Sequence, residues 1–506
     1  MSFTPGFRAM CLVFGAMAVF ALESKAQQDD TLRAKDLEEV VIKGYSPALQ
    51  KVSRLSPTEG SYIFLGKKNE VIPVGDLPAN LAEKNGRQVF AKIPGMFVYD
   101  MNGSGNQANI STRGLDPHRS WEYNIRQNGV MTNSDIYGYP ASHYSPPMES
   151  IQRIELVRGT SSLQYGAQFG GMINYIVKEA DTTKTFGFES INSVGSFGLL
   201  STYNAIGGKV GRLTYYGYYH QRQSNGFREN ARSEANAQYI SLGYDFSEKI
   251  NVKASLGRST YLYQIPGPLT DSMFYENPRQ ATRSRNYFNP DIYIPSVQLK
   301  WLINSTTQVD WLSSAVLGER NSVQFVGFAD VVDAIDPTTN EYAPRQVDID
   351  RFNSYSSELR LRKDYVINGV GQTLVLGIRY VDNDMHRRQQ GKGSTGTDFD
   401  LSLASAGFGR DLHHRTRNVS LFAENVFNLS PKLSLSPGIR IETGESNMSG
   451  KISYLPDEQV PLKQIHDFVL FGISGKYSLD ERHTLYGGWS QAYRPIVMAD
   501  IIPPTA

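Results

Sequence analysis

The residues of this 506-residue chain best suited to chemistry are clustered arginines. Arg279, Arg283 and Arg285 lie within one seven-residue stretch, and a second turn carries His118 and Arg119. A guanidinium group meets a carboxylate as a two-pronged donor, so both turns are candidate binding sites for an anionic molecule. An arginine in a long polar loop can also simply be solvated, and that alternative stays open.

Other motif-like strings lack the context that their chemistry needs. Gly391–Gly396 spells the dinucleotide-binding pattern, but no helix pattern follows it. His413 and His414 are adjacent, and neighbours along a strand point to opposite faces. Three aspartates are spaced somewhat like calcium ligands without the rest of the roughly twelve-residue loop, namely Asp330, Asp333 and Asp336. No nucleophile, base and orienting acid can be combined, so we expect neither an enzyme, nor a metal site, nor a cofactor.

The composition narrows the class of protein. Lys and Arg number 51 against 50 Asp and Glu, which gives no electrostatic footprint for nucleic acid. A mean hydropathy of −0.37 argues against a bundle of transmembrane helices. With 40% hydrophobic residues, 29 Tyr and 24 Phe, the chain is too apolar and aromatic to be mostly disordered. A large folded protein with a β-like composition remains.

The N-terminus has the pattern of a secretory signal peptide. An apolar run, Ala9–Leu22, follows Arg8 and precedes Ser24-Lys25-Ala26, which predicts cleavage after Ala26 and a signal peptide over residues 1–26. A short buried helix is the alternative. The single cysteine, Cys11, lies inside this leader, so the exported chain is expected to fold without disulfides.

The pattern changes twice after the leader. Residues 27–59 are polar apart from one strand signal, Leu37–Lys43. Residues 60–180 are mixed, with short strands, many glycines and a brief helical candidate at Arg87–Ile93. From Thr185 to the end, apolar and polar residues alternate with a period of two, which is typical of strands with one buried face.

Short turns and long loops alternate between these strands. Ile240, Leu242, Tyr244 and Phe246 share one face of a strand, and only Ser247–Lys249 separates it from the next. Long polar connections are expected at the other end, at Tyr263–Tyr287, Asn321–Arg351 and Met385–Leu412. This pattern is typical of an outer-membrane β-barrel, which must close because lipid offers no partner for a free sheet edge. A soluble β-sandwich or propeller is the alternative, but strands of about ten or more residues argue against it.

Several phrases before the strands resemble TonB-dependent outer-membrane receptors. They occur in the order Val89–Val98, Ile110–Leu115, Ile154–Gly159, Leu163–Gly166 and Gly170–Tyr175. Within that family the chain is most similar to the ferric dicitrate type, mainly through Pro266–Thr270, Asn277–Gln280 and Thr282-Arg283. The late stretch Trp489–Pro495 also resembles a barrel strand of the family.

The resemblance implies an antiparallel all-β transmembrane barrel, residues 185–506, with an N-terminal α+β plug domain, residues 60–180, in its lumen. It also implies a receptor in the cell outer membrane that imports an iron chelate such as ferric citrate or a similar siderophore. Another chelate or cofactor, such as a nickel chelate or cobalamin, is an alternative, as is a non-functional truncated receptor. The implied partners are the TonB energy-transducing complex, the ferric chelate and outer-membrane lipid, with no nucleic acid.

The resemblance assigns roles to particular residues. A TonB box in residues 27–59 would be the segment Asp36, Leu37, Glu38, Glu39, Val40, Val41 and Ile42, unless this segment is the first plug strand. The substrate-binding residues would be His118, Arg119, Arg279, Arg283 and Arg285, unless the loop arginines pair with lipopolysaccharide instead. A lock between plug and barrel would pair Arg113 and Arg158 with Glu358 and Glu424.

The strand count sets a final expectation. We expect about 13 strands after Thr185, whereas barrels of this family have about 22. The ending Ile501–Ala506 also lacks the terminal aromatic strand. The chain is therefore expected to be C-terminally truncated, either as a fragment or as a prematurely stopped product.

Overall fold

The computed structural model describes residues 52–100, 103–107, 109–159, 162–166, 168–495, 497 and 502. These residues belong to one compact unit. The expected signal peptide and the TonB-box segment, Asp36–Ile42, lie outside the described residues. Within the described ranges, no helix has the length and apolar character needed to cross a membrane.

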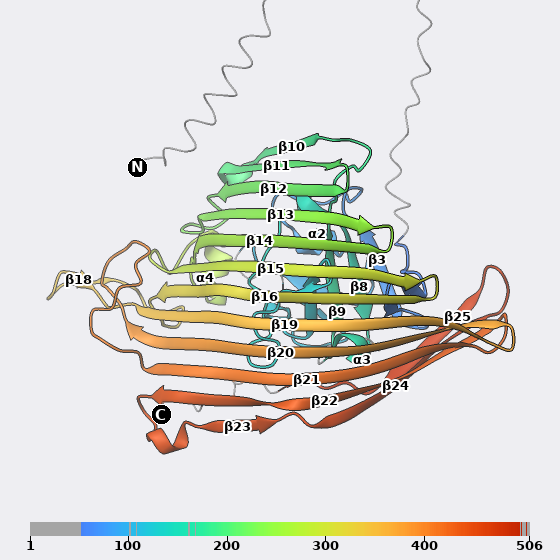
Figure 1. The fold of residues 1–506 in the computed structure, drawn as a ribbon. Helices are drawn as coiled ribbons and strands as arrows, with labels where there is room; N and C mark the ends of the chain where they lie inside the picture. Colours follow the sequence, from blue (N-terminus) through green and yellow to red (C-terminus); the bar gives the residue numbers. More distant parts are fainter. Residues whose placement is uncertain are drawn as a thin grey trace, which may run out of the picture. The chain divides into compact units, whose positions relative to one another are not determined.

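A large antiparallel sheet dominates the described chain (Figure 1). Thirteen strands follow one another along the sheet, and β23 pairs with β22 beside this path. The strands are β10 (Gly187–Gly195), β11 (Leu199–Val210), β12 (Leu213–Ser224), β13 (Ser233–Ser247), β14 (Ile250–Gln264), β15 (Tyr287–Asn304), β16 (Thr307–Gln324), β19 (Gln346–Ile367), β20 (Val370–Lys392), β21 (Arg410–Asn428), β22 (Leu433–Ile452), β23 (Leu462–Ile465), β24 (Phe468–Ser478) and β25 (Thr484–Ser490). The antiparallel sheet expected after Thr185 is confirmed.

The two faces of this sheet differ as the alternation predicts. Ile240, Leu242 and Phe246 of β13 are exposed, whereas Ala237 and Tyr239 of the same strand are buried. Successive side chains of a strand point to opposite faces, so the outward face is a row of apolar groups and the inward face is covered by other parts of the chain. Outward apolar residues suit contact with lipid.

The strands are longer, and the loops shorter, than the alternation indicates. β16 runs to Gln324, β19 begins at Gln346, β20 ends at Lys392 and β21 begins at Arg410. The expected loops Asn321–Arg351 and Met385–Leu412 are therefore strand at both ends. Most side chains there are polar, although Val323, Val347, Met385 and Leu412 are apolar and buried. The hydrophobic alternation is therefore interrupted while the backbone hydrogen bonds of the ladder continue.

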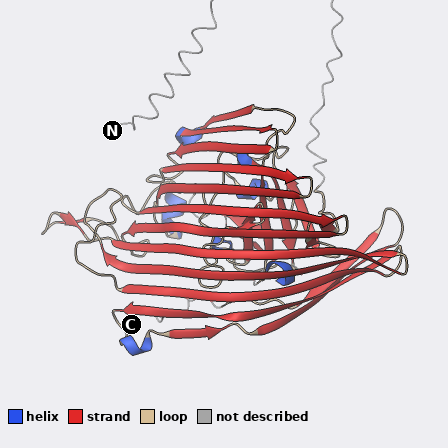
Figure 2. Ribbon diagram, viewed as in Figure 1, coloured by secondary structure: helices blue, strands red, loops and turns tan. Residues whose placement is uncertain are grey.

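The loops carry few regular elements of their own (Figure 2). They are α4 (Asp271–Glu276), β17 (Ile335–Asp336), β18 (Glu341–Tyr342) and the 3-10 turns η4 (Ser196–Gly198) and η5 (Asp457–Gln459). The long connections all join the same ends of the strands, and short turns join the other ends. We call the strand ends that carry the long connections the loop end of the sheet.

The segment before the sheet, which we call the plug, is built of short strands and very short helices. Five strands form a mixed sheet in the order β3 (Lys68–Pro73), β8 (Ile151–Arg158), β9 (Gly171–Val177), β6 (Tyr123–Gln127) and β7 (Val130–Met131). Two hairpins add β1 (Thr58–Glu59) with β2 (Tyr62–Ile63) and β4 (Met96–Tyr99) with β5 (Asn109–Thr112). The helical turns are α2 (Gly86–Val89), α3 (Ser162–Tyr165), η2 (His118–Ser120) and η3 (Met148–Ser150). The α+β character expected of this segment is confirmed.

The plug packs against the inward face of the large sheet. Its core of Ile72, Ile125, Ile154, Leu156 and Ile173 is continuous with inward-facing tyrosines of β11 to β13, namely Tyr203, Tyr216, Tyr218 and Tyr239. Apolar contact of this kind is stabilising but not directional. The position of the plug along the sheet must therefore be set by polar contacts.

Candidate functional site

Three charged side chains form a row across the loop end of the sheet. The register places Arg320 of β16 opposite Asp350 of β19, and Asp350 opposite Arg387 of β20. Arg320 Nη1 donates to Asp350 Oδ2 at 3.0 Å, and Arg387 Nε lies 3.5 Å from Asp350 Oδ1. All three are buried. Two guanidinium groups thus share one carboxylate, which leaves the row positively charged.

Three plug residues and His414 of β21 complete this group, which we call the loop-side cluster. It consists of Arg119, Tyr139 and His143 of the plug and of Arg320, Asp350, Arg387 and His414 of the sheet. The Arg119 guanidinium donates to the Tyr139 hydroxyl, which lies 3.0 Å from His143 Nε2. The guanidinium carbons of Arg119 and Arg387 lie 5.9 Å and 5.5 Å from the centre of the Tyr139 ring. Arginines of the plug and of the sheet therefore converge on one tyrosine.

Several polar atoms of the loop-side cluster are buried without a hydrogen-bond partner among the described residues. They are Arg119 Nε, His143 Nδ1, Arg320 Nε, Asp350 Oδ1, Arg387 Nε and Nη1, and both ring nitrogens of His414, with Arg387 Nε facing Asp350 Oδ1 at 3.5 Å. An unsatisfied buried polar group costs about 1–3 kcal/mol. An acceptor-rich anion bound here would satisfy several of these donors and balance the excess positive charge.

The plug histidine contributes as a neutral ring. Burial lowers the pKa of His143 well below its usual value, and the positive charges of Arg119 and Arg320 lower it further. At neutral pH the charge of the cluster therefore comes from the arginines. Within the described ranges, no three His, Cys, Asp or Glu side chains are grouped closely enough to hold a metal ion.

The two residues of the plug turn predicted to bind substrate have different surroundings. Arg119 lies in the loop-side cluster, and its left-handed backbone (φ 51°) is supported by a hydrogen bond from its own N–H to Asn109 Oδ1 at 2.9 Å. The His118 ring packs edge-on against Trp121, with ring centres 5.0 Å apart. Of this predicted pair, Arg119 therefore has the geometry of a binding residue.

The three arginines of the outer loop organise the loops. Arg283 donates to the backbone carbonyls of Gly327 and Phe328 at 2.9 Å and 2.8 Å. Arg285 forms a buried ion pair with Asp333 at 2.7 Å. The exposed Arg279 guanidinium donates to the Phe227 carbonyl at 3.1 Å. Substrate contact by these arginines stays a prediction, because their guanidinium groups already hold neighbouring loops together.

A second group of buried polar residues fixes the plug to the sheet at helix α3, and we call it the α3 clamp. Arg440, Arg360 and Arg379 donate to the carbonyls of Leu163, Gln164 and Tyr165 at 3.1 Å, 3.1 Å and 3.0 Å. The last carbonyls of a helix have no partner within the helix, so these arginines complete its C-terminus.

The residue after α3 must be small. Gly166 has a φ of +88°, and a Cβ atom there would lie 2.8 Å from Arg379 Nη2. Glycine adopts this left-handed conformation without steric cost. The Leu163–Gly166 phrase in the sequence therefore has a structural reason, since it presents three carbonyls and then makes room for the guanidinium groups.

Carboxylates of the sheet hold the clamp in place. Glu358 accepts a hydrogen bond from Arg360, and Glu442 accepts one from Arg440 at 2.6 Å. Glu424 receives Lys67 Nζ at 2.6 Å and Gln164 Nε2 at 2.9 Å, both from the plug. Burial lowers the pKa of Lys67, while Glu424 acts in the opposite direction. Removing either member of a pair this deeply buried would leave a costly uncompensated charge.

The predicted lock between plug and barrel is corrected by this geometry. Arg158 pairs with Glu70 of the plug, and Arg113 donates to the Phe169 carbonyl at 3.0 Å. Neither contacts Glu358 or Glu424, so the predicted pairing is wrong. Both arginines instead line a space bordered by β25. Glu358 and Glu424 lie on β19 and β21. The plug cations that reach the two glutamates are Lys67, with Glu424, and Arg126, 4.0 Å from Glu358.

The comparisons with known proteins agree with this architecture. Residues 68–172 match the TonB-dependent receptor plug domain, and residues 174–505 match the TonB-dependent receptor-like β-barrel. The ferric enterobactin receptor of Pseudomonas aeruginosa is 23% identical over 441 residues, which cover 78% of this chain and 57% of that protein. The unliganded ferric citrate transporter FecA superposes with a TM-score of 0.74 at 18% identity, over 86% of this chain and 64% of that one. The siderophore receptor PiuA from Acinetobacter baumannii gives 0.68 at 15% identity, over 88% and 68%.

A plug packed on the inward face of a long-stranded antiparallel sheet defines a plug-and-barrel receptor. The chain belongs to the TonB-dependent receptor family. It is an outer-membrane protein, and its relatives are receptors and transporters, not enzymes. The chain spans about three fifths of the length of the ferric enterobactin receptor and of FecA.

Proposed function

We propose that this protein is a receptor that binds an anionic iron chelate at the loop-side cluster and imports it with energy from the TonB complex. The observation that carries the proposal is the excess of buried guanidinium groups between plug and sheet, several of whose N–H groups lack an acceptor among the described residues. The names of the relatives, a ferric enterobactin receptor and a ferric citrate transporter, support iron chelates as the substrate class.

Ferric citrate is the chelate we propose first. Citrate complexes present carboxylate oxygens, and arginine binds carboxylates through two parallel hydrogen bonds. Arg320 and Arg387 come from neighbouring parts of the sheet, and Arg119 comes from the plug. A bound carboxylate chelate would therefore contact both the sheet and the plug. Through this double contact, binding of the chelate from outside the cell would change the contacts of the plug.

Import would require the plug to loosen. The α3 clamp and the Lys67–Glu424 pair hold it against the sheet. We propose that the TonB complex pulls on the N-terminal segment that contains Asp36–Ile42, which lies outside the described residues. Strand addition by a segment rich in β-branched residues is a common mode of recognition.

The test is uptake of radiolabelled iron by cells that express the chain, compared with cells that lack it. Ferric citrate should accumulate, and an uncoupler of the proton-motive force should stop accumulation while surface binding remains. Ferric enterobactin, a nickel chelate and cobalamin, each carrying a radiolabel on its own metal, identify the substrate in the same uptake format. Accumulation that resists the uncoupler would refute active import, and preference for one of the other compounds would refute ferric citrate.

A further inference from the structure

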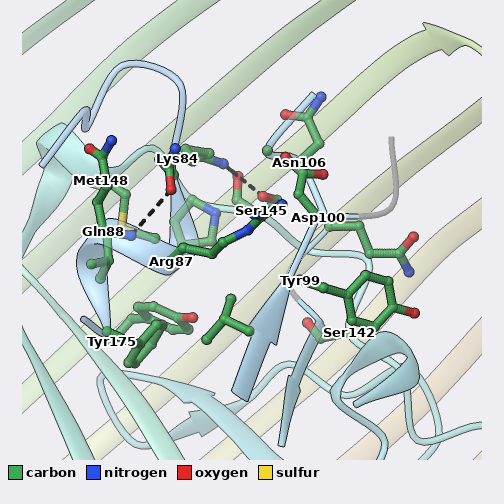
Figure 3. Close-up of a pocket in the computed structure, with 18 of the residues that line it drawn as sticks. Lys84, Arg87, Gln88, Tyr99, Asp100, Asn106, Ser142, Ser145, Met148 and Tyr175 are labelled. Carbon is green, nitrogen blue, oxygen red and sulfur yellow. Dashed lines mark hydrogen bonds between the residues drawn. The ribbon is translucent and has the colours of Figure 1, made fainter. Parts of the chain in front are cut away.

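The plug contains a second pocket that shares no residue with the loop-side cluster. It has a volume of about 430 Å³ and lies between α2, the β4–β5 connection and residues 142–148 (Figure 3). Pockets for small molecules usually measure about 300–1,000 Å³. The size is therefore sufficient for a small organic molecule, and the chemistry of the lining determines which kind.

A buried lysine supplies the strongest polar group of this plug pocket. Lys84 is 8% exposed, and its ammonium donates to the carbonyl and the hydroxyl of Ser145 at 2.9 Å and 2.7 Å. None of the described carboxylates forms an ion pair with it. Burial lowers the pKa of Lys84 well below its usual value, Arg222 lowers it further and Glu149 acts in the opposite direction. An anion bound beside Lys84 would offset this desolvation.

Two side-chain amides add donors to the same pocket. Arg222 of β12 donates to Asn106 Oδ1 at 2.6 Å and to the Ser104 carbonyl at 2.5 Å. This contact fixes the orientation of the Asn106 amide, because a flipped amide would turn its NH2 group toward the guanidinium. Asn106 Nδ2 and Gln107 Nε2 are both buried without a partner among the described residues. Two unsatisfied amide donors thus adjoin the pocket.

The remaining walls are largely aromatic. Phe90, Tyr99, Tyr144 and Tyr175 line the pocket, and Met148 adds a flexible thioether. Figure 3 shows Tyr99 and Tyr175 as two of these walls. The two exposed charges in the lining, Arg87 and Asp100, are opposite in sign and cancel. Flat aromatic walls suit a planar ring, which packs against aromatic neighbours in stacked or edge-on geometry.

We propose that the plug pocket binds a small aromatic carboxylate, with its carboxylate at Lys84, Asn106 and Gln107 and its ring between the aromatic walls. Charge-assisted hydrogen bonds to a buried cation are the strong ones, and they orient the ligand. Because Arg222 of the large sheet holds the loop that carries Asn106, occupancy would stiffen the contact of this loop with β12. The site is independent of the proposed chelate import.

The test is a titration of the full chain in detergent micelles with benzoate, followed by NMR of ¹³C-labelled methionine methyl groups. The Met148 signal, assigned with Met148→Leu, should move and saturate. Benzylamine, with the same ring and the opposite charge, should leave it in place. Lys84→Met and Asn106→Leu should each weaken benzoate binding at least about tenfold, whereas Lys184→Met, which removes an exposed lysine paired with Asp181, should not.

Three results would overturn the proposal: no movement of the Met148 signal at about 10 mM benzoate, equal movement with benzylamine, or unchanged benzoate binding in both pocket variants. If Lys84→Met does not fold, Asn106→Leu is the variant whose benzoate binding is compared with the wild type. The signals of the other methionines report whether each variant has the native structure. Ferric citrate binding measured on the same samples keeps the two proposals distinguishable, because the two sites share no residue.

Discussion

At the scale of single residues, the plug is held by a few buried charges whose partners can be removed one at a time. Lys67 and Glu424 are each 2% exposed and pair at 2.6 Å. Removing one member of a buried pair leaves the other charge without compensation, which costs about 3–5 kcal/mol, whereas replacing both with apolar groups is often close to neutral. Lys67→Met should therefore destabilise the plug more than Lys67→Met combined with Glu424→Leu. Chemical unfolding followed by tryptophan fluorescence measures both, and equal loss in the single and double variants would contradict the pair's role.

Gly166 tests the α3 clamp at the same scale. Gly166→Ala must adopt a left-handed backbone and displace the Arg379 guanidinium. We expect a cost of about 1 kcal/mol or more from the backbone alone, and faster hydrogen exchange in residues 162–166. Gly371→Ala is the matched control, because nothing lies within 4 Å of an added Cβ there. Unchanged exchange in Gly166→Ala would show that the arginines tolerate the methyl group and that the clamp is looser than described.

At the scale of elements, the loops over the sheet depend on one buried ion pair. Arg285 joins the loop between β14 and β15 to Asp333 in the loop between β16 and β19. Arg285→Met should leave Asp333 unpaired and make both loops more sensitive to limited proteolysis, with new cleavage between residues 325 and 345. The control is Arg232→Met, which removes an exposed arginine paired with Glu234. Identical cleavage patterns in the two variants would contradict this account.

The strands of the large sheet show which parts of the fold the hydrophobic alternation predicts. The alternation in β13 and β14 predicts strands because apolar residues mark the outward face over the apolar part of the membrane. The same signal is lost toward Arg387, where β20 continues with polar residues on both faces. The Arg320–Asp350–Arg387 row depends on the register of strands joined by long loops, and no local pattern specifies that register. The predicted lock pairing was wrong for a related reason, since Arg113 and Arg158 satisfy their donors within the plug.

At the scale of the whole molecule, the proposed import couples a binding site between plug and sheet to the TonB complex. Deleting Asp36–Ile42 should abolish uptake of ferric citrate and leave its surface binding intact, because the loop-side cluster does not include this segment. Uptake is measured with radiolabelled iron at 37 °C and binding at 0 °C. Uptake that survives the deletion would assign coupling to another part of the chain.

Binding of the chelate at the loop-side cluster can be measured by isothermal titration of the purified chain with ferric citrate. Arg320→Gln and Arg387→Gln should each weaken binding by about tenfold or more, because a hydrogen bond to a charged group contributes about 1.5–3 kcal/mol. Arg351→Gln is the control, since it removes an exposed arginine of β19 that pairs with Glu319. We expect the control to retain the wild-type affinity. Equal affinity in all four proteins, or a loss as large in Arg351→Gln, would contradict it.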